Sequence, residues 1–114
     1  APLLKEETIN KAINLLKKTK TYDSIMTIQK IYSWFWFLNK PVNYNPNILP
    51  RSQDAKPIIK ETTGLYGIKK NALQKYKCRI GKKPFFLEVD EKESIDLDNK
   101  FDFDLVNLLI KNID

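Results

Sequence analysis

Four aspartates near the carboxyl end of the chain have a spacing that could do chemistry. They stand at alternate positions in two pairs, where carboxylate oxygens could meet at one hard cation: Asp96, Asp98, Asp102 and Asp104. A calcium-binding loop also needs a central Gly and a terminal Glu, and this spacing lacks both. We interpret the segment as a solvated acidic loop and predict no metal site.

Signals for a nucleophile or a phosphate site are also incomplete. The 114 residues contain no His, which removes the commonest general base, the usual partner of a nucleophilic Ser or Cys, and most zinc sites. Gly64 and Gly67 lie in a turn that could approach a phosphate, but no Gly-Lys-Ser/Thr element accompanies them. We therefore predict that the chain is not an enzyme and takes no cofactor.

A basic segment is the strongest candidate for binding a partner. Residues 1–83 carry 17 Lys and Arg against 5 Asp and Glu, whereas residues 84–114 carry 3 against 9. Clustered cations neutralise phosphates, as in many RNA-associated proteins. The alternative is a solvated strand face whose charges are balanced by Glu88 and Asp90. The predicted nucleic-acid-binding residues are Lys69, Lys70, Lys75, Lys77, Arg79, Lys82 and Lys83.

Aromatic residues give a second candidate surface. The longest apolar run is Trp34 to Leu38, far below the roughly 20 residues that cross a bilayer, so we predict no membrane span. Indole rings can stack on bases, but aromatic residues on a helix more often serve a core or a subunit contact. We predict protein contacts through Trp34, Trp36 and Phe37.

The elements that position these residues begin with two helices. Ile9, Ala12, Ile13 and Leu16 recur at helical spacing between residues 8 and 20. A second helix is predicted from Asp23, a good N-cap, to residue 39, where Lys40-Pro41 stops it. Together they would make a helical hairpin over residues 1–39.

A long proline-containing loop is predicted next. Residues 40–63 contain four Pro and three Asn outside any sustained periodicity. Only a short strand at Ile58 and Ile59 could interrupt them. A loop of this length in a compact domain is expected to lie along another surface.

The clearest expected element is a β-hairpin over residues 75–90. Both halves alternate with period two around a loop at residues 81–84. Antiparallel pairing would set Cys78 opposite Leu87 on one face and Lys77 opposite Glu88 on the other. A final helix capped by Asp102 or Asp104 would follow, giving an α+β fold in one domain, residues 1–114, with residues 64–114 holding the β-hairpin and this helix.

One local resemblance accompanies this pattern. Residues 60–68, Lys-Glu-Thr-Thr-Gly-Leu-Tyr-Gly-Ile, resemble a stretch near the start of the 13-kDa B-type accessory subunit of mitochondrial respiratory complex I. In that family a long helical bundle follows the stretch, whereas a hairpin is expected here. No residue roles are carried across.

These observations predict a non-catalytic structural subunit of a larger intracellular assembly. The leading interpretation is a ribonucleoprotein of the organellar ribosomal protein type, which contacts RNA through the basic β-hairpin. The alternative is an accessory subunit of a protein-only complex such as a mitochondrial respiratory complex. The lone Cys78 suits a reducing compartment, so we expect an intracellular location, and a mitochondrial one fits both interpretations.

Overall fold

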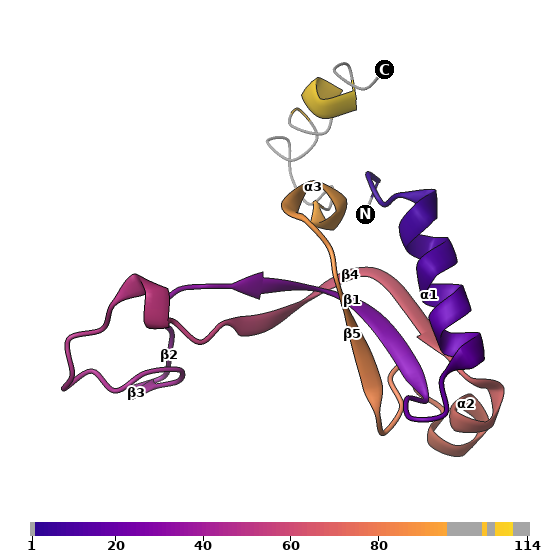
Figure 1. Cartoon of the computed structure of the whole chain (residues 1–114), viewed down its shortest axis with the longest axis horizontal. Coiled ribbons are helices and arrows are strands. Elements are labelled where there is room, and N and C mark those ends of the chain that lie inside the picture. The colour runs from indigo at the N-terminus through magenta and orange to yellow at the C-terminus, as the bar shows by residue number, and fades with distance from the viewer. Residues whose placement is uncertain (1, 96–103, 105–106, 111–114) are drawn as a thin grey trace. The chain divides into compact units, whose positions relative to one another are not determined.

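The computed structural model describes residues 2–95, 104 and 107–110, which form helices and a mixed β-sheet (Figure 1). The predicted α+β class is thus confirmed. The chain divides into two compact units, one built from residues 1–29 and 61–114 and the other from residues 30–60. No helix in the described part of the chain is long and apolar enough to cross a membrane.

The first unit contains most of the secondary structure. Its elements are α1 (Glu6–Lys18), β1 (Ser24–Ile31), β4 (Ile58–Ile68), α2 (Lys70–Tyr76), β5 (Pro84–Glu88) and α3 (Glu91–Ser94), with the ends of β1 and β4 continuing into the second unit. The second unit holds β2 (Trp36–Phe37), β3 (Lys40–Pro41) and a short 3-10 helix, η1 (Ser52–Asp54).

Helix α1 forms where helical periodicity predicts it, with bounds shifted by two residues. Glu6 and Glu7 lie in its first turn and Lys17 and Lys18 in its last, so charges of both signs complement the helix dipole. Ala12 faces inward and is 3% exposed. The predicted N-terminal helix is confirmed.

The predicted second helix over residues 23–39 is wrong. Residues 24–28 form the first part of β1, and all five are buried. A strand buried on both faces reads as a continuous apolar run, which periodicity alone does not separate from a buried helix. The β-branched Ile25, Thr27 and Ile28 favour the strand.

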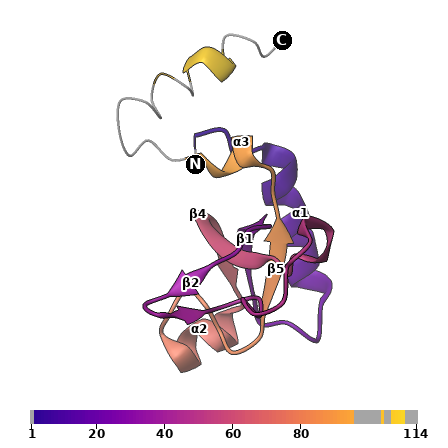
Figure 2. The same ribbon diagram turned by 90° about the vertical axis from the view of Figure 1, so that its left-hand side faces the viewer.

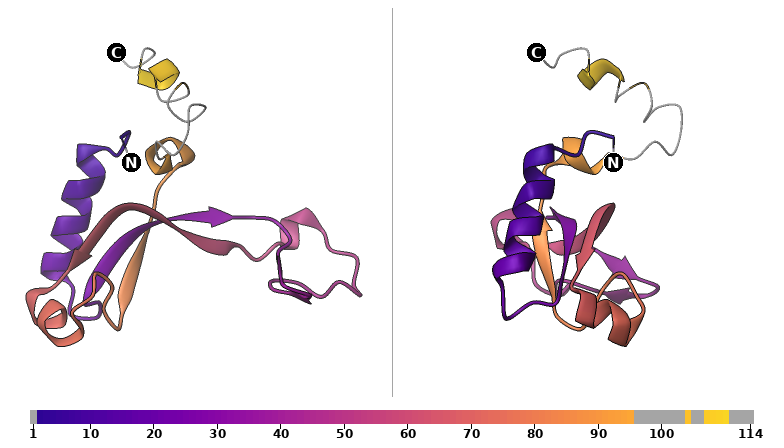
Figure 3. Two further views of the ribbon diagram at one scale, coloured as in Figure 1. Left: turned by 180° about the vertical axis from the view of Figure 1, so that it is seen from behind. Right: turned by 90° about the vertical axis from the view of Figure 1, so that its right-hand side faces the viewer.

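Strand β1 lies at the centre of a three-stranded sheet with the order β4-β1-β5. It pairs in parallel with β5, with Ile25 opposite Phe85 and Thr27 opposite Leu87, while β4 runs in the opposite direction (Figure 1). Helix α1 lies along the sheet (Figures 2 and 3). The core between them joins Ala12, Ile25 and Leu87, surrounded by Leu15, Leu16, Leu65 and Phe85.

The predicted β-hairpin over residues 75–90 does not form. Residues 70–76 are helix α2, which ends at Lys77 in the left-handed conformation with φ 55°, and β5 pairs with β1 instead. Asp23 holds the loop before β5 in place, because its carboxylate accepts hydrogen bonds from the N–H groups of Lys82 (2.9 Å) and Lys83 (3.0 Å). Only the second half of the alternating segment is therefore a strand, β5. The first half belongs to the end of α2 and the irregular loop after it.

The remaining predictions have mixed outcomes. The proline-containing segment is irregular from residue 42 to 57 apart from η1, but β4 takes up residues 58–63. Asp104 and residues 107–110 are helical, and the rest of the predicted final helix lies outside the described residues. An unpredicted short helix, α3, begins at Asp90, whose Oδ1 accepts from the N–H of Glu93 at 2.9 Å.

Candidate functional site

The predicted protein-contact residues lie together in the second unit, in a segment that we call the aromatic hairpin (residues 34–44). Strands β2 and β3 are antiparallel, with Trp36 opposite Pro41 and Phe37 opposite Lys40. Leu38 and Asn39 form the two-residue turn between them, and Leu38 has φ 55°. Glycine is the usual residue at such a backbone angle because a Cβ is disfavoured there.

Asn43 holds the base of the aromatic hairpin. Its Oδ1 accepts the N–H of Phe35 at 3.0 Å, and its Nδ2 donates to the carbonyl oxygens of Ser33 (2.7 Å) and Lys56 (2.8 Å). The N–H of Val42 also donates to the Phe35 carbonyl at 2.9 Å. The side-chain amide of Asn43 therefore links both ends of the aromatic hairpin to Lys56, shortly before β4.

Tyr44 organises the two indoles. Its hydroxyl accepts a hydrogen bond from Trp36 Nε1 at 2.9 Å, and its ring centroid lies 5.0 Å from that of Trp34. The Tyr44 and Trp36 rings meet edge to face, with centroids 6.3 Å apart. The indole N–H of Trp36 thus has a hydrogen-bond acceptor, while the Trp36 ring stays half exposed.

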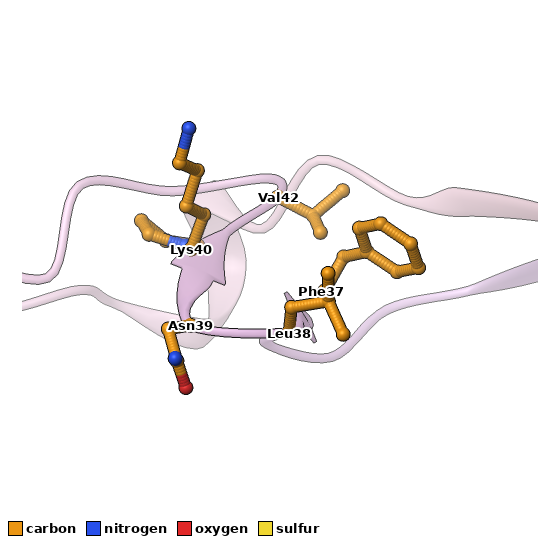
Figure 4. Close-up of a pocket in the computed structure, with 6 residues that line it drawn as sticks. Phe37, Leu38, Asn39, Lys40 and Val42 are labelled. Atoms are coloured by element: carbon orange, nitrogen blue, oxygen red, sulfur yellow. The ribbon is translucent and has the colours of Figure 1, made fainter.

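Beyond this cluster, the tip of the hairpin is apolar and exposed. Phe37 is 71% exposed and Leu38 is 83% exposed. Together with Val42 and Pro41 they surround a hollow of about 590 Å³, with Asn39 and Lys40 at its edge (Figure 4). The predicted helix over these residues is replaced by a hairpin that presents them to solvent.

A second, more polar pocket of about 270 Å³ lies in the same unit. Its lining includes the aromatic Trp34 and Tyr44 together with Lys56 and the ion pair between Arg51 Nε and Asp54 Oδ2, at 2.8 Å. The Arg51 side chain is 69% exposed, so its guanidinium is accessible to a solute. Sequence reasoning did not single out these polar residues, because Arg51 and Asp54 are brought together by η1 within an irregular segment.

The predicted nucleic-acid-binding cations lie on α2 and the loops beside it. Lys69 precedes α2, and its Nζ donates to the carbonyl of Thr19. Lys70 and Lys75 belong to α2, with the Lys75 amine 5.4 Å from the Tyr76 ring centroid. The loop that follows carries the others: Lys77, Arg79, Lys82 and Lys83.

Arg79 takes part in a chain of contacts that crosses to β4. Its guanidinium lies 4.3 Å from the ring centroid of Tyr66, and the Tyr66 hydroxyl donates to Glu61 Oε2 at 2.7 Å. Burial, and then the hydrogen bond and negative charge of Glu61, raise the pKa of Tyr66. The pairs expected from the hairpin register are absent, since Asp90 caps α3 and Lys77 forms no ion pair with a described residue.

The acidic segment provides no metal site in the described part of the chain. No group of three or more metal-ligating side chains occurs among residues 2–95, 104 and 107–110. Asp96, Asp98 and Asp102 lie outside the described residues, so their predicted role as a solvated loop stays a prediction.

Comparison with known proteins changes the expected class of this chain. No family model matches it. Over 111 residues it is 26% identical to N-acylneuraminate cytidylyltransferase A of zebrafish (Danio rerio), a match that covers 90% of this chain and 25% of that protein. The chain thus spans about a quarter of the length of its curated relative.

This similarity contradicts the prediction that the chain is not an enzyme. The prediction depended on the absence of His and of a nucleophile with its base. Transfer of a group at phosphorus relies mainly on positioning and on stabilisation of charge, so it requires neither. A catalytic constellation absent from one segment also says nothing of residues elsewhere in an enzyme, and the chain is similar to an enzyme rather than to a structural subunit.

Proposed function

We propose that this chain is part of a nucleotidyltransferase that transfers a cytidylyl group to an acylneuraminate. The observation that carries the proposal is the similarity over 90% of the chain to a protein of that activity. In such a reaction an acceptor hydroxyl attacks the α-phosphorus of CTP and pyrophosphate leaves. The proton of the acceptor passes to a base or to solvent.

The polar pocket of the second unit has the chemistry of an acylneuraminate site. This acceptor is a sugar acid, with a carboxylate, several hydroxyl groups and apolar C–H faces. A guanidinium suits a carboxylate because it offers two parallel N–H donors. Arg51 is the accessible guanidinium, Asp54 can accept from hydroxyl groups, and Trp34 and Tyr44 offer aromatic faces.

The test is an activity assay on the full-length protein. With CTP, N-acetylneuraminate and Mg²⁺ we expect pyrophosphate and a cytidylyl sugar in equal amounts. Arg51→Ala is expected to raise KM for the sugar acid more than KM for CTP, and Arg51→Lys to recover part of the loss because it restores charge without the planar fork. Lys60→Ala is the matched control, an exposed cation on β4.

One result would overturn the proposed activity, and another would overturn only the assignment of the acceptor site. One is the absence of a cytidylyl product from any acylneuraminate. The other is an equal rise of both KM values in Arg51→Ala, which would leave the activity in place but remove the pocket from the acceptor site.

A second proposal, from a different observation, is that the basic segment binds RNA. Six of its seven cations, all but Lys69, are exposed on α2 and in the loop that follows it, where phosphates can reach them. Affinity for single-stranded RNA is then expected to fall steeply with salt. Changing Lys82 and Lys83 together to Ala should flatten the log-log slope by about one to two units, and an unchanged slope would contradict the proposal.

A further inference from the structure

An open apolar groove lies in the first unit, between α1 and the start of α2 (Figure 1). Ile13 and Leu16 of α1 form its floor, and it encloses about 450 Å³. Ile13 is 45% exposed, whereas its neighbour Ala12 is buried in the core. The apolar surface of α1 thus extends beyond the face that packs on the sheet, onto a flank that is open to solvent.

The rim of the groove is positively charged. It is formed by Lys17, Lys69 and Lys70, and the lining that the described residues provide contains no carboxylate. Lys69 is held in place, because its N–H donates to the Asp23 carbonyl at 3.0 Å and its Nζ donates to the Thr19 carbonyl. An ammonium group has three donors, so two remain for an occupant. The groove therefore suits an occupant that is apolar on one side and acidic along its border.

The C-terminal segment (residues 96–114) has the complementary composition. It contains nine large apolar residues, and five Asp against two Lys. Asp104 and residues 107–110 are helical, and Leu108 is 59% exposed. Asp104 and Leu108 are four residues apart, a spacing that sets two side chains next to each other on one side of a helix. This pair of an acidic and an apolar side chain matches the rim and the floor of the groove.

The chain is long enough for the C-terminal segment to reach the groove. Glu93 Oε1 accepts hydrogen bonds from the Lys5 N–H and the Thr8 hydroxyl, so the chain is fixed beside the first turn of α1 just before the segment begins. Ile13 lies five residues after Thr8, about 7.5 Å further along the helix axis. The nine residues 95–103 span up to about 30 Å when they are extended.

We propose that the C-terminal segment docks in this groove of its own chain, with Leu108 on the floor beside Ile13 and Asp104 at the lysine rim. Charge complementarity and reach select this occupant. The inference is independent of the proposed catalytic activity, because it uses no residue of the polar pocket in the second unit. A docked segment would also compete with phosphates for the rim lysines.

A pair of engineered cysteines tests the contact directly. In a Cys78→Ser background, Ile13→Cys with Leu108→Cys should form a disulfide in a mild oxidant such as oxidised glutathione. The product is expected to keep the mass of one chain, 13.4 kDa, and to migrate faster than the reduced protein on a denaturing gel. Far-UV circular dichroism of the reduced variant should match the wild type, since both replaced side chains are exposed.

The matched control moves one cysteine to the other side of α1. Lys11 is exposed and lies two residues before Ile13, about 200° around the helix. Lys11→Cys with Leu108→Cys should therefore form little disulfide under the same conditions. Equal yields from the two pairs would overturn the proposal. A product of two chains from the Ile13→Cys pair would overturn it too, because the groove would then hold the segment of a second copy.

Charge reversal at the rim tests what guides the segment. Lys17→Glu together with Lys70→Glu, in the Ile13→Cys and Leu108→Cys protein, should slow disulfide formation by about threefold at low salt, because like charges then face Asp104. Adding Asp104→Lys should restore part of the rate, and about 1 M NaCl should reduce the differences. An unchanged rate in the reversed variant would contradict docking at the lysine rim.

Discussion

At the scale of single residues, Gly67 shows how closely α1 approaches the sheet. A Cβ at this position would lie 2.9 Å from Ile25 Cγ2 and 3.3 Å from Leu16 Cδ2. Both neighbours belong to the core, so neither can move freely. Gly67→Ala is expected to lower the free energy of unfolding by about 1–3 kcal/mol, the usual cost of overpacking, as measured by urea denaturation.

The opposite result would be equally informative. Replacing Gly by Ala stabilises a protein by about 0.4–1 kcal/mol where the backbone and the space allow it, through the unfolded state. An increase in stability would therefore mean that the side chains of Ile25 and Leu16 leave more room beside Gly67 than the structure shows.

Asp23 gives a prediction about pH. Burial alone would raise its pKa, but the N–H groups of Lys83 and Lys82 and the hydroxyl of Ser24 outweigh it, so the pKa of Asp23 is lowered. A carboxyl whose pKa is lower in the folded state contributes stability above its unfolded pKa, about 3.9. That contribution is lost as the pH falls through the lower folded value.

The measurement is the urea midpoint between about pH 6 and pH 2 for the wild type and Asp23→Asn. The wild type should lose its advantage over the variant below about pH 4, where the free carboxyl titrates. A difference between the two proteins that stays constant over this range would contradict the assigned hydrogen bonds.

At the scale of elements, the aromatic hairpin depends on one side chain. Asn43→Ala removes three hydrogen bonds, and because each contributes about 0.5–1.5 kcal/mol net when it is well shielded, partial exposure places the expected loss near 1–3 kcal/mol. Hydrogen exchange of the Phe35 amide should accelerate. Asn39→Ala, in the exposed turn of the same hairpin, is the matched control and should leave that exchange unchanged.

The elements also show what could be predicted from sequence. Helix α1 was predictable because its apolar spacing and terminal charges agree. Strand β1 was not, because its buried run at residues 24–28 owes its conformation to β5, some sixty residues later. Likewise the alternation at residues 75–80 is typical of a strand, but no strand forms there. Helix α2 ends in the left-handed conformation at Lys77, and the hydrogen bonds to Asp23 hold the following loop at Lys82 and Lys83.

At the scale of the whole molecule, the basic and aromatic residues lie on other elements than the sequence predicted, and their binding roles stay predictions. The expected pairing of Lys77 with Glu88 assumed a hairpin, and its loss leaves the basic segment without those partners. The pair of Arg51 and Asp54 was not predicted, because an irregular segment has no periodicity from which a pocket can be inferred. The enzyme relationship came from similarity along the chain, which no single motif expresses.

The long-range contacts of α1 and β1 have a consequence for the order of events during synthesis. Glu93 Oε1 accepts hydrogen bonds from the Lys5 N–H and the Thr8 hydroxyl at the start of α1, and β1 receives β5 only after residue 84. These contacts must wait until nearly all of residues 1–93 have left the ribosome. The aromatic hairpin closes through contacts between residues 33 and 56, so at about 5–20 residues per second it is complete seconds earlier. Neighbouring ribosomes on one messenger would then carry finished hairpins on unfinished chains.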